Sequence, residues 1–200
     1  MQRTKIILFT FILCITGFSV KAQQYLIDSL NFIIENSASD REKMKACFML
    51  QEKLLVKDFD ECLAAAQRGA SLAQKINDSS SFGGFQSAIG RAYYFKGNYD
   101  SAATYYYKSI GILRKTGDQP KLAAALNDLG KLYRKSRDLD RALQMYDEAF
   151  AIYNRLNDEE GMGTILNESG VVFEYKENYD EAISRYKRSL EIRERMSDTI

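Results

Sequence analysis

The stretch that decides the fold runs from Gly117 to Leu156 and reads GDQPKLAAALNDLGKLYRKSRDLDRALQMYDEAFAIYNRL. Asp118 suits the N-cap of a helix, and Pro120 follows in the first turn, where a missing N–H breaks no helical hydrogen bond. Apolar residues then recur every three or four positions on either side of a polar turn at 135–138. The first stripe is Leu122, Leu126, Leu129, Leu132 and Tyr133, and the second is Leu139, Ala142, Leu143, Tyr146, Ala149 and Ile152. This stretch is therefore predicted to form two amphipathic helices.

The same pattern recurs along the chain with a period of 40 residues. Gly90, Gly130 and Gly170 are 40 apart, and five further columns keep that register without an insertion. These columns are Ala102, Ala142 and Ala182, preceded by Cys62; Tyr106, Tyr146 and Tyr186; Asp60, Asp100, Asp140 and Asp180; Asp78, Asp118, Asp158 and Asp198; and Ile112, Ile152 and Ile192. Helical hairpins that repeat in one register stack into a solenoid, because no single unit buries both of its faces alone. The sequence predicts an all-α, right-handed α-solenoid.

The columns also predict how each hairpin packs. The second helices should start near Phe59, Tyr99, Leu139 and Tyr179. A mid-helix glycine costs about 1 kcal/mol relative to alanine, so its expected role is to let the second helix approach the first. The alanine column is the expected contact on that second helix, and the tyrosine column is expected to fill the space between hairpins.

These residues resemble a known repeat family. The pattern Leu129-Gly130-x-x-Tyr133, followed by Ala142, Tyr146 and Ala149, is similar to the tetratricopeptide repeat signature. Similar patterns begin at Ile89-Gly90 and at Ser169-Gly170. The family's usual period is 34 residues, and the period of 40 resembles the longer variant of kinesin light chains and of some bacterial peptide-sensing regulators.

The chain is expected to divide into a leader and repeats. Residues 1–22 are predicted to be a signal peptide, 23–39 a capping helix, 40–78 a degenerate repeat, and 79–118, 119–158 and 159–198 three regular repeats. In the degenerate repeat, Leu50 replaces the glycine and Cys62 replaces the alanine. At the other end, no further helix seals the apolar face of Ile183, Tyr186, Leu190 and Ile192. We therefore expect the chain to be part of a longer protein that continues beyond residue 200, or a partner to cover that end.

The N-terminus has the features of an exported protein. Arg3 and Lys5 precede an uncharged run from Ile6 to Val20, and Ala22 offers a small residue at the cleavage position. The alternative is an uncleaved anchor, but the run is shorter than the roughly 20 residues that span a bilayer. Leu13 precedes Cys14, which does not suit a lipoprotein signal. The expected location is the periplasm or envelope, with membrane contact only through the signal peptide or a downstream segment.

Composition excludes several activities. The chain contains no His, so it supports no Ser-His-Asp or Cys-His catalysis and no His-ligated zinc. A net charge of +1 gives no reason to expect nucleic acid binding. No phosphate loop, paired catalytic carboxylates or metal-ligand spacing is present, so no enzyme activity and no cofactor is predicted. The resemblance places Cys47 towards the concave groove and Cys62 within a helix pair, and whether the two form a disulfide is left open.

The family resemblance implies a peptide-binding groove. In tetratricopeptide folds the first helices line the concave face, and the positions three before, one after and four after each repeat glycine point into it. These positions hold Ser87, Arg91, Tyr94, Asn127, Lys131, Arg134, Asn167, Val171 and Glu174. In the longer variants, asparagines at the positions of Asn127 and Asn167 look like clamps for an extended backbone. Arg91, Lys131 and Arg134 would favour an acidic partner.

Two functions are therefore expected. The first is a protein- or peptide-binding scaffold in the bacterial envelope. The alternative is the sensory region of a larger membrane-bound histidine kinase or helix-turn-helix regulator, because a signal peptide followed by such repeats resembles the N-terminal halves of envelope sensors of Bacteroidetes-like bacteria. In that case, the effector would lie downstream of residue 200.

Overall fold

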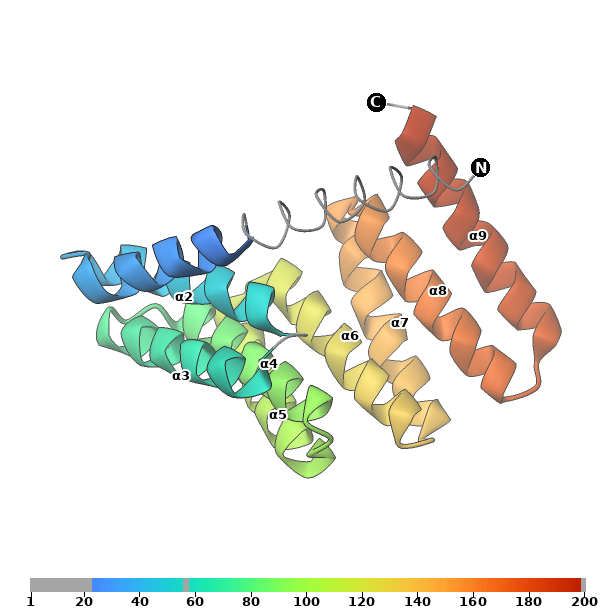
Figure 1. Ribbon diagram of the computed structural model, residues 1–200. Helices are drawn as coiled ribbons and strands as arrows, with labels where there is room; N and C mark the ends of the chain where they lie inside the picture. Colours follow the sequence, from blue (N-terminus) through green and yellow to red (C-terminus); the bar gives the residue numbers. More distant parts are fainter. Residues whose placement is uncertain (1–22, 56–57, 199–200) are drawn as a thin grey trace, which may run out of the picture.

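All regular structure in the described part of the chain is α-helical (Figure 1). The structure is a computed structural model that describes residues 23–55 and 58–198. A helix over residues 23–36 comes first. It is followed by α2 (Asp40–Leu54), α3 (Phe59–Lys75), α4 (Ser79–Phe95), α5 (Tyr99–Thr116), α6 (Gln119–Lys135), α7 (Leu139–Leu156), α8 (Glu159–Tyr175) and α9 (Tyr179–Asp198). The predicted all-α class is confirmed.

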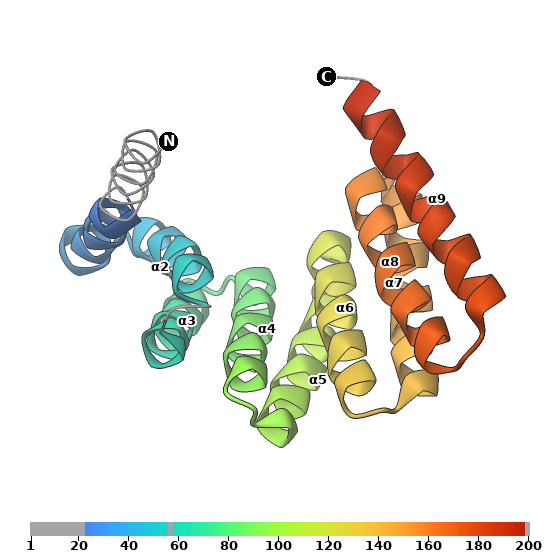
Figure 2. The ribbon, with the colours of Figure 1, turned by 45° about the vertical axis from the view of Figure 1, so that its right-hand side comes forward.

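The helices form antiparallel hairpins that stack side by side (Figure 2). Each first helix packs against its own second helix, in the pairs α2–α3, α4–α5, α6–α7 and α8–α9. The first helices also touch one another, α4 with α6 and α6 with α8, whereas no comparable contact joins α5 to α7 or α7 to α9 in the described structure. The stack is therefore closer on the side of the first helices, which makes that side concave. The predicted α-solenoid is confirmed.

Short polar side chains cap the helices. Asp118 accepts a hydrogen bond from Lys121 N at the start of α6, with Pro120 in the first turn. Asp78, Asp138 and Asp158 accept in the same way at α4, α7 and α8. The second helices begin at Phe59, Tyr99, Leu139 and Tyr179, which confirms the predicted starts.

The turns that join the helices from α3 to α9 share a left-handed residue. This residue directly precedes the capping residue and has a φ between 54° and 78°, at Asn77, Gly97, Gly117, Arg137, Asn157 and Glu177. In most of these turns the next N–H bonds back to a carbonyl five residues earlier; Asp138 N, for example, lies 2.9 Å from Tyr133 O. Arg137 and Glu177 adopt this conformation although their side chains disfavour it, which shows how strongly the hairpin geometry imposes the turn.

The repeat glycines lie beneath the repeat tyrosines of the same hairpin. A Cβ placed on Gly90, Gly130 or Gly170 would lie 2.8, 2.5 or 2.6 Å from the ring of the tyrosine sixteen residues later. The rings of Tyr106 and Tyr146 are almost completely buried. Each ring therefore fills space within its own hairpin, where only a glycine leaves room, and this contact was not predicted. Tyr106 also lines a pocket with Asp128 and Lys131 of the next hairpin, in line with the expected position between hairpins.

In the degenerate first repeat, the large and small residues of the glycine–tyrosine pair are swapped between the two helices. Leu50 stands at the glycine position, and Ala66, rather than a tyrosine, stands at the ring position. Both side chains are buried in the same core cluster. A large residue on the first helix and a small one on the second preserve the total volume, which is the kind of exchange a packed core tolerates.

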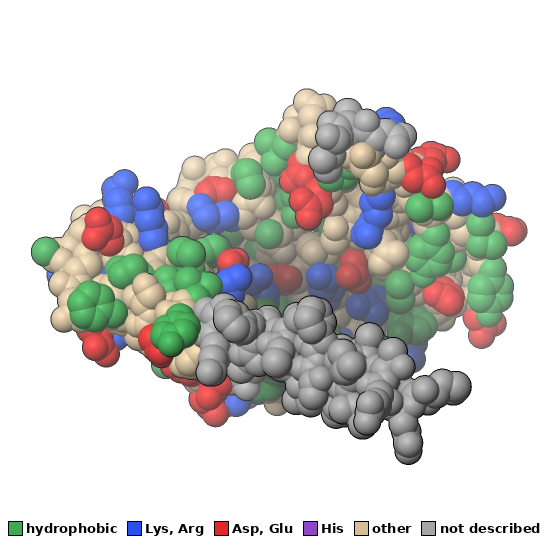
Figure 3. Space-filling model, turned by 45° about the horizontal axis from the view of Figure 1, so that its top comes forward, with side chains coloured by type: hydrophobic (Ala, Val, Ile, Leu, Met, Phe, Trp, Pro, Cys, Tyr) green, Lys and Arg blue, Asp and Glu red, His purple; other side chains and the backbone are tan. Residues whose placement is uncertain are grey.

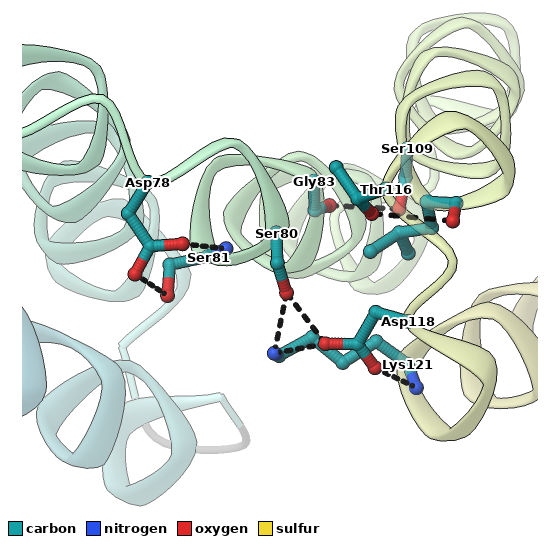
Figure 4. Close-up of polar contacts among 9 residues, drawn as sticks. Asp78, Ser80, Ser81, Gly83, Ser109, Thr116, Asp118 and Lys121 are labelled. Carbon is teal, nitrogen blue, oxygen red and sulfur yellow. Dashed lines mark hydrogen bonds and ion pairs between the residues drawn. The ribbon is translucent and has the colours of Figure 1, made fainter.

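Two polar features fix neighbouring helices in register (Figure 4). Within a hairpin, Ser109 Oγ donates to Gly83 O at 2.8 Å. Between hairpins, Lys121 Nζ donates to Ser80 Oγ at 2.8 Å and to Asp118 Oδ2 at 2.6 Å. The second network ties the N-terminus of α4 to that of α6.

The two ends of the solenoid differ. At one end, Ile27, Leu30 and Ile34 of the helix 23–36 are buried against the first hairpin. At the other end, Ile183 and Leu190 of α9 are 50% and 56% exposed, whereas Ile192, which was expected to be uncovered, is buried. The predicted signal peptide lies outside the described residues. None of the helices that the structure describes is long and apolar enough to cross a membrane.

Candidate functional site

The residues assigned to the groove all lie on α4, α6 and α8, the helices of the concave side. They differ in exposure. Ser87 and Asn127 are buried, at 8% and 9% exposed. Arg91, Tyr94, Lys131, Arg134 and Val171 are half-buried, and Asn167 and Glu174 are exposed. Asn127 and Asn167 occupy the same repeat position. Within the part of the chain that the structure describes, α6 contacts the first helices α4 and α8, whereas α8 contacts α6 as its one neighbouring first helix, so the two amides have different surroundings.

Three of these residues meet in one pocket. Arg91, Tyr94 and Lys131 line a hollow of about 200 Å³ together with Leu55, Phe95, Tyr106 and Asp128. The pocket is lined from the end of α2, from α4 and α5, and from α6. In Figure 3 the face is hollowed near its middle, and Lys, Arg, Asp and Glu side chains gather in that hollow.

The basic residues of the groove are paired with acidic residues of the next hairpin. Arg91 Nε lies 3.7 Å from Asp128 Oδ2, to which Ser87 Oγ donates at 3.3 Å. In the next pair of first helices, α6 and α8, Arg134 and Lys131 lie 3.2 and 3.7 Å from the Glu168 carboxylate. The ion pairs therefore run as a ladder from α4 to α6 and from α6 to α8.

Asp128 and Glu168 are groove residues that the sequence analysis missed. Each stands two positions before a repeat glycine, so a signal was present in the period. Burial raises the pKa of the Asp128 carboxyl, and Arg91 and Lys131 oppose that effect. Glu174 is also engaged, because Tyr186 Oη donates to it at 2.9 Å. The groove thus presents a balanced set of charges and no uninterrupted basic stripe.

Some buried polar atoms of the groove have no hydrogen-bond partner among the described residues. They include Asn127 Oδ1. Arg91 Nε and Arg134 Nε also lack a hydrogen bond, but both guanidinium groups are ion-paired, with Asp128 and Glu168. An amide oxygen accepts from an N–H group, and a guanidinium N–H donates to a carbonyl or carboxylate. A buried polar atom without a partner costs free energy, so a ligand N–H that reached Asn127 Oδ1 would be stabilised there, once a local movement had exposed this oxygen.

The described residues give no sign of a metal site or of a reactive thiol. No three His, Cys, Asp or Glu side chains among them lie close enough to hold a metal ion. Cys47 and Cys62 are free and fully buried, so Cys47 does not open into the groove as the resemblance implied. Burial raises the pKa of each thiol to about 11, which keeps both protonated at neutral pH.

The family model for the tetratricopeptide repeat matches residues 85–155 and 138–195, which together span more than half of the chain. The chain belongs to the tetratricopeptide repeat family. No curated protein sequence matches it.

Solved structures share the fold of this tetratricopeptide repeat protein at low identity. BtubC (BKLC) from P. vanneervenii is 21% identical, with a TM-score of 0.73 over 88% of this chain and 72% of that one. The kinesin light chain TPR-like repeats of Podosopora anserina are 16% identical, with a TM-score of 0.65 over 92% and 90%. PlcR of Bacillus thuringiensis, in complex with the peptide PapR7 and DNA, is 13% identical, with a TM-score of 0.71 over 88% and 65%. At these identities the likeness shows the fold alone.

Proposed function

We propose that this tetratricopeptide repeat chain is a scaffold that binds an extended segment of another protein in its concave groove. The observation that carries the proposal is the buried amide of Asn127, whose Oδ1 has no hydrogen-bond partner among the described residues although it lies on the helix at the centre of the groove. An amide can accept from one backbone N–H and donate to one carbonyl, so it can hold a chain without reading its side chains. PlcR, which shares the fold, is bound to a peptide in its solved structure.

The proposal assigns no catalytic activity to these repeats. The expected preference for acidic partners carries less weight than the sequence suggested, because Asp128 and Glu168 already face Arg91, Lys131 and Arg134. A ligand carboxylate would have to compete with these internal partners. Shape and backbone hydrogen bonds are therefore the better-supported basis of recognition.

The proposed location is the bacterial envelope, and this rests on the sequence of residues 1–22 alone. If the signal peptide is cleaved after Ala22, the exported protein should begin at Gln23. N-terminal sequencing of the protein isolated from its own cells tests this. A chain that retains Met1 and stays in the cytoplasm would overturn the proposed location and leave the groove proposal intact.

The alternative, a sensory region of a larger membrane-bound regulator, would use the same groove to detect its ligand. The reading frame of the gene distinguishes the two. A downstream segment of about 20 apolar residues followed by a kinase or DNA-binding domain would favour the sensor.

The groove proposal is tested by selecting ligands from a random peptide library displayed on phage. A selected peptide should bind the parent chain and lose about tenfold or more in affinity to Asn127→Ala, which corresponds to one hydrogen bond in a buried site. The variant should keep the melting temperature of the parent, because Asn127 Oδ1 bonds no described residue.

Asn154→Ala on the second helix α7 is the matched control, because that asparagine is exposed and lies away from the first helices. It should bind the peptide as the parent does. Equal affinity of Asn127→Ala and the parent, or peptides whose binding depends on the second helices, would show that the groove is not the binding site.

A further inference from the structure

The N-terminal part of the concave side holds a second pocket, which has no role in the proposed function as stated above. Its volume is about 330 Å³, and its lining is almost entirely apolar. Its apolar lining comes from Met44, Phe48 and Met49 of α2 and Phe85 of α4, and the other lining residues are Lys45, Ser81 and Lys121. The rings of Phe48 and Phe85 meet edge to face, with centroids 5.8 Å apart. A pocket of this size and lining is typical of sites that bury a large apolar group.

The pocket belongs to a wider apolar surface. Phe48 and Met49 are 36% and 46% exposed, although side chains of this kind are usually buried. Met49 and Lys45 also line a second hollow, which continues to Phe32 and Ile33 of the helix 23–36. Figure 3 shows hydrophobic side chains gathered over this end of the molecule, at the left of the view. Exposed apolar patches of this kind mark interaction sites.

The pocket and the charged groove are parts of one surface. The apolar pocket is lined from α2, α4 and α6, and the pocket around Arg91 and Lys131 is lined mainly from the same three helices, nearer their C-terminal ends. An extended segment lying along the concave side can therefore reach both. The two parts differ in chemistry, because one is mainly apolar and the other includes the charged side chains of Arg91, Asp128 and Lys131.

Because the charged residues of the groove are already paired with one another, the apolar pocket is the stronger source of selectivity between partner segments. Arg91 is paired with Asp128, and Lys131 and Arg134 with Glu168. A partner's carboxylate would replace an existing ion pair and would gain little by the exchange. A bulky apolar side chain, in contrast, would bury the exposed faces of Phe48 and Met49 and displace only water from them.

We propose that this pocket takes a large apolar side chain of the partner segment, and that the protein selects its partner by that anchor and not by the partner's net negative charge. The proposal rests on the proposed function, since it places the anchor on the segment that the groove binds. The occupant is a segment of another protein, because the pocket lies on the same three helices that mainly line the pocket around Arg91 and Lys131.

The test uses the full chain and the peptides selected from the random phage library. The selected sequences should share one position occupied by Phe, Leu, Met or Trp and should show no excess of Asp and Glu. The double variant Phe48→Gln/Met49→Gln should weaken binding of a selected peptide by about tenfold or more, which is the scale for losing burial of one large apolar side chain. Replacing the shared apolar residue of the peptide by Ala should have the same effect and leaves the protein untouched.

Salt separates the two modes of recognition. Raising NaCl from about 0.05 M to about 0.5 M strongly screens exposed charges, and binding should change by less than about threefold. Leu156→Gln is the matched control, because Leu156 is 40% exposed at the end of α7, away from the pocket. It should bind as the parent does.

Three results would overturn this proposal and leave the groove proposal intact. The first is selection of acidic peptides that share no apolar position, and the second is a loss of affinity of tenfold or more at high salt. The third is unchanged binding by Phe48→Gln/Met49→Gln when Asn127→Ala binds weakly. A parent chain that dimerises through the pocket, with a monomeric double variant, would show a second copy as the occupant and would also overturn it. If the library yields no peptide at all, both this proposal and the groove proposal are wrong.

Discussion

The ring of Tyr146 occupies the space that a side chain on Gly130 would need. A Cβ on Gly130 would lie 2.5 Å from Tyr146 Cε1, closer than real atoms approach. The same relationship holds in the neighbouring repeats, between Gly90 and Tyr106 and between Gly170 and Tyr186. The glycine column of the sequence is thus a consequence of the tyrosine column.

Gly130→Leu should destabilise the protein by about 1–3 kcal/mol, because the added side chain has to displace a fully buried ring. Urea unfolding followed by circular dichroism measures this. Gly111→Leu is the control, because a Cβ at Gly111 meets no atom within 4 Å. Equal stability of the parent and Gly130→Leu would show that the ring moves aside freely.

The first repeat suggests a rescue of that variant. Leu50 and Ala66 hold the positions of Gly130 and Tyr146, with the sizes exchanged. Tyr146→Ala should therefore be less harmful in Gly130→Leu than in the parent, with a coupling free energy of about 0.5–3 kcal/mol in a double-mutant cycle. If the two effects simply add, the two residues do not share one volume.

Ser109→Ala should cost about 0.5–1.5 kcal/mol, because it removes the bond to Gly83 O that joins the two helices of a hairpin. The same bond recurs between Ser189 and Gly163 at 2.7 Å, so Ser189→Ala should also destabilise. Ser71→Ala serves as the control, since Ser71 Oγ bonds only a carbonyl of its own helix, at Gln67. Thermal unfolding of the three variants compares them, and a loss as large in Ser71→Ala would contradict the role of the inter-helix bond.

Helix α9 should open more readily than the central helices. Among the described helices it packs mainly on α8, with side-chain contacts to α7 from Arg185 and Arg188, and Ile183 and Leu190 are half exposed. Stability in a solenoid is a sum of repeat and neighbour terms, so the last hairpin has one favourable term fewer. Hydrogen exchange read by mass spectrometry should be faster in 179–196 than in 122–152. Equal protection in a monomeric sample would contradict this expectation.

The two buried thiols should react slowly in the folded protein. Burial raises the pKa of Cys47 and Cys62 to about 11, from an ordinary value of 9.0. Because the folded state favours the protonated thiols, their contribution to stability is present below about pH 9 and is lost as the pH rises towards 11. Iodoacetamide should label both residues quickly in urea and slowly without it at pH 8. Rapid labelling of the folded chain would show that the thiols are accessible.

The fold could be predicted from the sequence because each hairpin repeats the same pattern of capping, turn and apolar residues. The forty-residue period places the caps, the turns and the apolar stripes, and the second helices begin at the predicted residues Phe59, Tyr99, Leu139 and Tyr179. The contact of each tyrosine ring with the glycine of its own hairpin was not predicted, because a period gives spacing along the chain but does not show which side of a helix faces its partner.

The groove was only partly readable for a similar reason. The pattern placed Arg91, Asn127 and Lys131 on the correct helices, but it did not show that Asp128 and Glu168 would pair with the basic residues. Such pairing depends on the offset between successive hairpins, which the sequence period does not contain. The burial of Asn127 and the exposure of Asn167 depend likewise on how many neighbours each helix has.

The matched pairs of the core have a consequence for how such a chain can change over generations. Gly130 with Tyr146, Leu50 with Ala66, and the serine bond to Gly83 each lie entirely within one hairpin. Recombination that joins two genes at a turn between hairpins would therefore never separate the two members of a pair. Whole hairpins can be copied, lost or exchanged as intact units, while each is free to find its own combination of sizes.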